Sequence, residues 1–256
     1  MSKSKYGLDQ FYTKSEVARR CLETLNLTDY DTIIEPSAGE GVFFHLAEHQ
    51  DKIAYDIEPK SDDIEQCNFL TKDLSFLGNR KVLFFGNPPF GRNSSLALKF
   101  IKKCCLHADT IAFILPKGFK KRSMIDKIPL NFEVSLIQDL TEDIFTFEGK
   151  DFMVPCVWVI LKKTEVLREK EIKLSPTKFT FTTKQHANLA IRRVGINAGD
   201  VFTDTDVSIT SHYFLRVEDP QTAQRLISQI QFSSGDTTGP RSIPKNELII
   251  KLDQIL

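Results

Sequence analysis

One stretch, residues 82–91, constrains this chain more than any other, and it reads Val-Leu-Phe-Phe-Gly-Asn-Pro-Pro-Phe-Gly. The apolar run from Val82 to Phe85 predicts a short buried strand, and Gly86 allows a sharp turn where that strand ends. Two prolines then fix their own φ at about −65° and push Asn87 out of the helical region. We therefore expect a rigid loop that presents two acceptors, the side-chain oxygen of Asn87 and the carbonyl of Pro88.

A loop of this kind suits a reaction at an amino group attached to a ring. Such a nitrogen is a poor nucleophile because its lone pair is delocalised, and two acceptors on its hydrogens draw it toward tetrahedral geometry while Phe90 stacks on the ring. Asn87 is neutral, so it positions the amine and is not a strong base. With Pro88, Pro89 and Phe90 it resembles catalytic motif IV of the amino-methyltransferases, which use S-adenosylmethionine to methylate adenine N6 or a glutamine amide. A plain Pro-Pro turn after a buried strand is the alternative.

A second loop lies upstream, in residues 32–43, which read Thr-Ile-Ile-Glu-Pro-Ser-Ala-Gly-Glu-Gly-Val-Phe. This pattern predicts a strand, a glycine-bearing loop and a helix beginning near Val42, with free N–H groups at its positive end. It resembles motif I of the same family, which implies that Glu35 faces the amino-acid part of the cofactor and that Ala38 and Gly39 face its adenosine. The glycine spacing is not that of a dinucleotide-binding loop, so NAD is the poorer interpretation.

Two further segments complete the expected cofactor site. Asp56 ends a predicted strand and can accept hydrogen bonds from both ribose hydroxyls, with Glu58 as the alternative. Cys67-Asn68-Phe69 resembles motif III, and residues 10–13, Gln-Phe-Tyr-Thr, resemble motif X ahead of a helix with a Thr13/Glu16 capping box. The resemblance therefore assigns the cofactor to Gln10, Phe11, Tyr12, Thr13, Glu35, Pro36, Ser37, Ala38, Gly39, Asp56, Ile57, Asn68, Phe69 and Asn87.

The charges are unevenly distributed although the net charge is zero. Residues 1–80 hold nine Lys and Arg against fifteen Asp and Glu, whereas residues 81–128 hold ten against two. The basic excess falls on the segment that carries the Pro-Pro loop, so we expect a face that meets a polyanion. The residues assigned to nucleic acid are Arg92, Lys117, Lys120, Lys121, Arg122, Arg192 and Arg193. Solvated lysines on an ordinary helix face are the alternative, and they account in part for Lys99 to Lys103.

Composition limits the remaining possibilities. Five cysteines without a Cys-x-x-Cys pair are typical of core residues and do not indicate a disulfide framework or a zinc finger. His45 and His49 lie one helical turn apart without a third ligand, so we expect a solvated helix face and no metal. No apolar run is long enough to span a membrane, and the first residues lack the core of a signal peptide, so a cytoplasmic location is expected, or a nuclear one in a eukaryotic host.

The later strands predict the rest of the sheet. Residues 111–115 are fully apolar, and residues 132–137 and 154–161 form a closing pair. Between that pair, residues 145–152 resemble the family segment that carries a second aromatic stacked on a flipped base, and Phe147 is our choice for it. Core packing is the alternative for Phe145, Phe147 and Phe152. From about residue 165 the chain becomes polar, and we expect a linker and then a small target-recognition region with a final helix started by Ser242. A C-terminal extension packed on the sheet, or an oligomer contact, is the alternative.

The order of cofactor loop, catalytic loop and C-terminal region resembles the gamma group of adenine-N6 DNA methyltransferases. The resemblance implies an α/β, Rossmann-like class I methyltransferase fold with a mostly parallel seven-stranded sheet, helices on both faces and an antiparallel last strand. It implies a catalytic domain over residues 1–164 and a target-recognition region over 165–256. The expected reaction is methyl transfer from S-adenosyl-L-methionine to adenine N6 in DNA. RNA as substrate, a protein glutamine amide as substrate, and a catalytically silent nucleic-acid-binding subunit are the alternatives, and the oligomeric state is left open.

Overall fold

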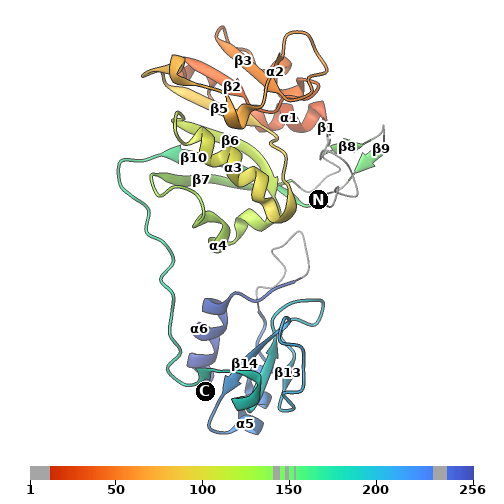
Figure 1. Cartoon of the computed structure of the whole chain (residues 1–256), viewed down its shortest axis with the longest axis vertical. Helices are drawn as coiled ribbons and strands as arrows, with labels where there is room; N and C mark the ends of the chain where they lie inside the picture. Colours follow the sequence, from red (N-terminus) through yellow and green to blue (C-terminus); the bar gives the residue numbers. More distant parts are fainter. Residues whose placement is uncertain (1–11, 141–144, 148–149, 153, 233–240) are drawn as a thin grey trace. The chain divides into compact units, whose positions relative to one another are not determined.

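The computed structural model describes residues 12–140, 145–147, 150–152, 154–232 and 241–256. It divides into two compact units, Met1–Lys170 and Glu171–Leu256 (Figure 1). The sequence prediction placed the division after Thr164. Each unit has its own hydrophobic core and is described separately below.

A seven-stranded sheet forms the centre of the first unit. Its strands are β2 (Thr32–Glu35), β3 (Lys52–Asp56), β4 (Glu65–Gln66), β5 (Val82–Gly86), β6 (Thr110–Pro116), β7 (Phe132–Leu140) and β10 (Cys156–Lys163). Their order in the sheet is β4-β3-β2-β5-β6-β10-β7. Neighbours from β4 to β6 pair in parallel, and β10 pairs antiparallel with both β6 and β7. The predicted mostly parallel sheet with an antiparallel last strand is therefore confirmed.

Helices cover both faces of this sheet, because its central strands are apolar on both sides. On one face α1 (Ser15–Leu22) and α2 (Val42–Leu46) pack on a core that includes Leu83 and Phe85. On the other face α3 (Ser95–Cys104) and α4 (Arg122–Ile125) pack on a core that includes Val82 and Phe84. The alternation along β5 thus supplies both layers. Short 3₁₀ turns lie at η1 (Leu27–Asp29), η2 (Phe69–Thr71), η3 (Ser75–Leu77), η4 (Arg92–Ser94), η5 (Lys117–Lys120) and, in the second unit, η6 (Lys184–His186).

The cysteines are all free thiols, and four of the five are buried, as predicted. Burial raises the pKa of Cys21 and that of Cys105 to about 12. No group of three possible metal ligands gathers within the described part of the chain. Nor does that part contain a helix with the length and apolar character needed to cross a membrane.

A small three-stranded sheet joins residues that are distant in the chain. β1 (Tyr12–Thr13) pairs with β8 (Phe145–Phe147), which pairs with β9 (Lys150–Phe152). Thr13 lies opposite Phe145 in this ladder, so it does not cap the first helix. The N-cap of α1 is Lys14, which makes no side-chain capping bond, and the predicted Thr13/Glu16 capping box is therefore wrong.

The second unit is a four-stranded sheet with two helices. Its strands are β11 (Thr180–Phe181), β12 (Leu189–Arg192), β13 (Val201–Phe202) and β14 (His212–Arg216), in the order β11-β14-β12-β13. The helices are α5 (Pro220–Ile227) and α6 (Lys245–Ile255). Asp219 caps α5 by accepting the N–H groups of Gln221 and Thr222. The expected Ser242 helix start is wrong: Ser242 forms a β-bridge with Val194, and Pro244 is the N-cap.

Candidate functional site

Two loops meet at one edge of the main sheet. β2 and β5 are parallel neighbours, with Ile34 opposite Phe84, so the loops that follow them emerge side by side. The hydroxyl of Ser37 in the glycine loop donates a hydrogen bond to the backbone carbonyl of Asn87, with an O–O distance of 3.3 Å. In open α/β sheets ligands bind beyond the carboxyl ends of the strands. The two motifs found in the sequence therefore lie together where a ligand site is expected.

The Asn87 loop is held from both of its ends. Gly86 has a φ of +118°, and a Cβ atom there would lie 2.9 Å from a carboxyl oxygen of Glu35, so the turn requires glycine. At the other end, the carbonyl of Phe90 accepts the N–H groups of Leu96 and Ala97 at 3.1 and 3.3 Å. Within the loop, the Asn87 side-chain oxygen is out of contact with solvent. The loop is thus preorganised, as its two prolines predict.

Phe90 is only partly buried. Its ring contacts that of Phe145 edge to face, with 6.3 Å between centroids and an angle of 64°. Phe145 itself is fully buried. The sequence choice for a second aromatic was Phe147; it lies in the same strand β8, but its side chain is outside the described residues. No short-range pattern could have linked Phe145 to Phe90, which is distant in the chain.

Glu35 is a buried acid at the end of β2, with 2% of its surface exposed. One carboxyl oxygen accepts the N–H of Phe44 at 2.8 Å. Burial raises the pKa of Glu35 well above its ordinary value, the Phe44 hydrogen bond lowers it, and the charge of Asp56 raises it further. This bond also occupies an N–H group at the start of the five-residue helix α2. The expectation that these groups are free is wrong for Phe44.

The glycine loop is fastened to the end of β3. Asp56 accepts the N–H of Gly39 at 2.7 Å through one carboxyl oxygen and the N–H of Glu58 at 2.8 Å through the other. The N–H of Ala38 bonds the carbonyl of Tyr55 at 2.9 Å. A carboxylate has about four acceptor positions, so Asp56 keeps about two for a ligand. Beside it, the side chain of Ile57 is 58% exposed, which leaves it accessible to a ligand.

Tyr12 covers the glycine loop. A Cβ atom on Gly39 would lie 3.2 Å from the Tyr12 ring, and Gly39 has a φ of +56°. A side chain at position 39 would be strained by this φ and would need the Tyr12 ring to move by a few tenths of an ångström, so glycine suits the position. Burial raises the pKa of the Tyr12 hydroxyl. Gln10 and Phe11, the other residues of the motif X prediction, lie outside the described residues, and Thr13 is buried in β1.

The motif III residues have structural partners. Asn68 is exposed, and its side-chain oxygen accepts the N–H of Leu70 at 3.1 Å. Phe69 is 2% exposed and stacks on Phe100, with 5.5 Å between ring centroids. Its core position leaves little of the ring available to a cofactor.

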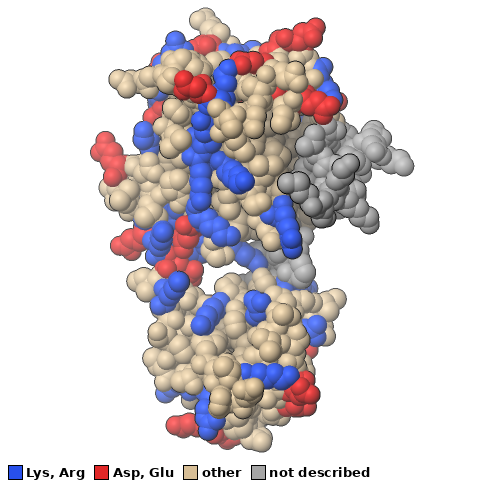
Figure 2. Space-filling model, in the orientation of Figure 1, with Lys and Arg blue, Asp and Glu red and all other residues tan. Residues whose placement is uncertain are grey.

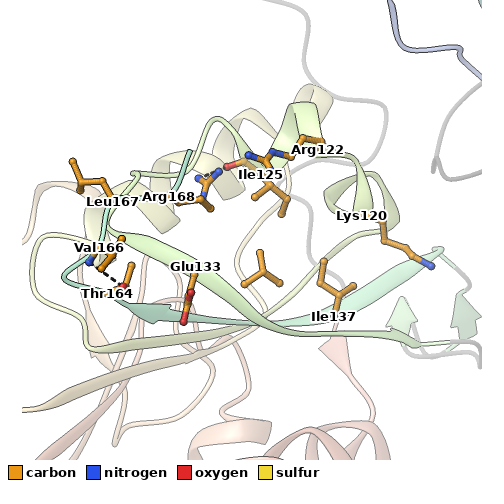
Figure 3. Close-up of a pocket in the computed structure, with 10 residues that line it drawn as sticks. Lys120, Arg122, Ile125, Glu133, Ile137, Thr164, Val166, Leu167 and Arg168 are labelled. Atoms are coloured by element: carbon orange, nitrogen blue, oxygen red, sulfur yellow. Dashed lines mark hydrogen bonds between the residues drawn. The ribbon is translucent and has the colours of Figure 1, made fainter. Parts of the chain in front are cut away.

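The residues predicted to bind nucleic acid fall into different environments. Lys120 pairs with Asp139 at 3.0 Å, and Arg122 pairs with Asp126 at 2.9 Å. Figure 3 shows both side chains at the border of an open hollow on the α4 side of β7. The hollow is lined by Lys120, Arg122, Ile125, Glu133, Val134, Ile137, Thr164, Val166, Leu167 and Arg168.

The other cations predicted to bind nucleic acid differ in exposure. Lys117 and Lys121 are half-buried, whereas Arg92 is exposed. In the second unit, Arg192 donates to the carbonyl of Val194, and Arg193 donates to the carbonyl of Thr210. These partners could not be seen in the sequence.

Comparisons with known proteins give likenesses in structure. Neither a protein-family model nor a curated protein sequence matches the chain. The 23S rRNA methyltransferase ErmE superposes with a TM-score of 0.47 and 18% identity, over 63% of this chain and 73% of that one. A Pyrococcus horikoshii protein assigned as an RNA methyltransferase superposes with a TM-score of 0.44 and 18% identity, over 61% and 89% of the two chains.

A Vibrio vulnificus protein assigned as a modification subunit of a type I restriction enzyme is also similar. It gives a TM-score of 0.46 and 12% identity, and the match covers 91% of this chain and 58% of that one. These likenesses do not decide the reaction or the substrate.

Proposed function

We propose that the chain transfers a methyl group from S-adenosylmethionine to the N6 amino group of adenine in DNA. The observation that carries the proposal is the contact between two loops on adjacent strands, through the bond from the Ser37 hydroxyl to the Asn87 carbonyl. The glycine loop supplies a place for a nucleoside-containing cofactor. The Asn-Pro-Pro-Phe loop supplies acceptors and an aromatic face for the amino group that takes the methyl.

The residues around Gly39 fit the cofactor. Asp56 retains acceptor positions for the ribose hydroxyls. The next residue, Ile57, has an exposed side chain that can pack against the adenine ring. Tyr12 lies over the loop so closely that a Cβ at position 39 would be 3.2 Å from its ring. Glu35 is a buried acid whose pKa is raised, so an ammonium group placed beside it would favour its charged form. When bound, S-adenosylmethionine supplies a methyl carbon on a sulfonium sulfur.

The Asn87 loop holds the nucleophile. In the reaction the side-chain oxygen of Asn87, which solvent does not reach in this structure, becomes accessible to the substrate. It and the carbonyl of Pro88 then accept the two hydrogens of the adenine amine, and Phe90 stacks on its ring. These contacts raise the lone-pair density on nitrogen at the moment of attack. S-adenosylmethionine held by the glycine loop would supply the methyl group to this nitrogen, and its sulfur would leave as a neutral thioether. Asn87 has no basic atom, so the amine proton passes to water.

The order of the segments along the chain favours DNA as the substrate. The cofactor loop precedes the catalytic loop, and a separate unit follows both, as in the gamma group of DNA methyltransferases that the chain resembles. The basic excess over residues 81–128 favours a polyanion over a protein glutamine amide. An intact Asn-Pro-Pro-Phe loop argues against a catalytically silent subunit.

The test is transfer of labelled methyl from S-adenosylmethionine to duplex DNA, single-stranded DNA, total RNA and a glutamine-containing peptide, followed by analysis of the product. We expect N6-methyladenine in DNA. Label in adenine of RNA alone would move the assignment to an RNA methyltransferase, and label in glutamine would move it to a protein methyltransferase. Nucleic-acid binding without any transfer would indicate a silent subunit.

A further inference from the structure

The outer face of α3 differs from the basic loop that follows β6. Lys99 and Lys102 are exposed on α3, and Arg92 is exposed in η4 just before it. Within the described residues, none of these three cations forms an ion pair, whereas Lys120 and Arg122 pair with carboxylates at 3.0 and 2.9 Å. A cation already paired with a carboxylate gains less from a phosphate. In the part of the chain that the structure describes, the exposed cations of residues 81–128 that form no ion pair are Lys81, Arg92, Lys99, Lys102 and Lys127, and three of these five lie on α3 or in η4 just before it.

The buried side of α3 fixes which cations face outward. Ala97, Phe100, Ile101 and Cys104 are buried against the sheet. Lys99 and Lys102 are three residues apart and so lie on the same side of the helix. Lys103, by contrast, is half-buried. The hydrogen bonds from Ser75 are the main cause that lowers the pKa of Asp73, and the charge of Lys103 lowers it further. Figure 2 shows Lys and Arg atoms running over the face on which α3 lies in Figure 1, with Asp and Glu atoms mainly to the side of them.

The helix is joined tightly to the catalytic loop. The carbonyl of Phe90 accepts the first N–H groups of the helix, from Leu96 and Ala97. Gly91 has a φ of +65°, and a Cβ there would lie 2.7 Å from the Cβ of Leu96, so the chain folds back on itself between loop and helix. Asn93 and Ser94 also have positive φ, a conformation that costs free energy and is retained where the surroundings require it. The cations of α3 are thus held at a fixed position relative to Asn87.

We propose that Arg92, Lys99 and Lys102 form the surface that holds the sugar–phosphate backbone of the nucleic acid beside the target adenine. This proposal rests on the proposed function, because it names the part of the chain that positions that substrate. The partner is identified by its chemistry: a row of phosphate charges, contacted without regard to base sequence. The ion-paired loop residues Lys120 and Arg122 are then secondary.

The experiment measures binding of a labelled adenine-containing duplex over a series of salt concentrations. The test variant is Arg92→Gln with Lys99→Gln and Lys102→Gln. Its matched control is Lys81→Gln with Lys162→Gln and Lys163→Gln, which removes three exposed cations from the opposite edge of the sheet. A third variant, Arg92→Lys with Lys99→Arg and Lys102→Arg, keeps the charge.

Each duplex phosphate contact contributes a slope of about 0.9 in log affinity against log salt, so the test variant should lose about 2.7 in slope. If both proteins bind equally at about 1 M salt, this difference in slope makes the variant roughly 500-fold weaker than the wild type at about 0.1 M. The control and the charge-conserving variant should keep the wild-type slope, and calorimetric affinity for S-adenosylmethionine should be the same in all of them.

Two results would overturn the proposal. An unchanged slope in the test variant, in a protein that still methylates adenine, would make α3 an ordinary solvated face while leaving the proposed function in place. A wild-type protein that binds S-adenosylmethionine but does not bind nucleic acid would remove the polyanion substrate itself. The methyl-transfer and cofactor measurements thus separate a failure of this inference from a failure of the proposed function.

Discussion

Replacing Asp56 by alanine tests how the chain holds its cofactor. Its carboxylate already accepts two backbone N–H groups, from Gly39 and Glu58, at 2.7 and 2.8 Å. Of about four acceptor positions, about two remain for ribose hydroxyls. A hydrogen bond to a charged group contributes about 1.5–3 kcal/mol. In the variant, water can replace the lost carboxylate as the partner of the ribose hydroxyls, which limits the loss. We therefore expect Asp56→Ala to weaken S-adenosylmethionine binding by about 1.5–3 kcal/mol, or roughly 10- to 150-fold in Kd.

Isothermal calorimetry measures this loss, and two variants separate its causes. Asp73→Ala removes another carboxylate that accepts a backbone N–H, that of Ser75 at 2.9 Å, but lies away from the loop, so it should leave the affinity unchanged. Glu58→Ala tests the alternative acid. Full affinity in Asp56→Ala together with a loss in Glu58→Ala would move the ribose contact to Glu58, and full affinity in both would refute the nucleoside interpretation of this loop.

Two further predictions concern stability. Because burial raises the pKa of Glu35, the folded chain holds its proton more tightly than the unfolded chain, so stability should fall as pH rises above the ordinary pKa of a glutamate. Glu35→Gln lacks this ionisation. Urea unfolding over a range of pH should therefore show the wild type losing stability relative to the variant as pH rises. An equal pH dependence of the two would contradict the buried-acid account. Arg168 donates to Asp126 and to the carbonyls of Ile125, Ile128 and Phe132, so Arg168→Ala should destabilise the first unit by about 1.5–3 kcal/mol. The exposed Arg225→Ala should change the free energy of unfolding by less than about 0.5 kcal/mol, and equal effects of the two would show that the Arg168 contacts contribute nothing.

The parts of the fold that could be predicted are those set by local pattern. The apolar run before Asn87 becomes β5, and the glycine positions allow the turns that their φ values require. The sequence also placed the last two strands of the sheet, because residues 132–137 alternate largely between apolar and polar and residues 154–161 are almost all apolar. These features depend on neighbours within a few residues.

The features that could not be predicted depend on distant partners. Thr13 and Glu16 match a capping box, but Thr13 pairs with Phe145 in β8, and this pairing overrides the local signal. Lys120 looks like a free cation in the sequence, and its carboxylate partner Asp139 lies on the distant strand β7. The pair of Arg122 with Asp126 spans only four residues, so it was visible in the sequence and was overlooked. The Asp219–Pro220 start of α5 is a different case: the cap and N1 proline signal was present and was overlooked.

The most direct test of the central claim is a single-turnover measurement of methyl transfer to adenine by the wild type and by Asn87→Ala. Loss of one preorganised hydrogen-bond partner costs about two to three orders of magnitude in rate, so the variant should fall by that amount. Its calorimetric affinity for S-adenosylmethionine should stay close to that of the wild type, since the Asn87 side chain is assigned to the target amine and the residue meets the glycine loop through its backbone carbonyl, which alanine keeps. N6-methyladenine formed by the variant at a near-wild-type rate would contradict the assignment of this loop to catalysis.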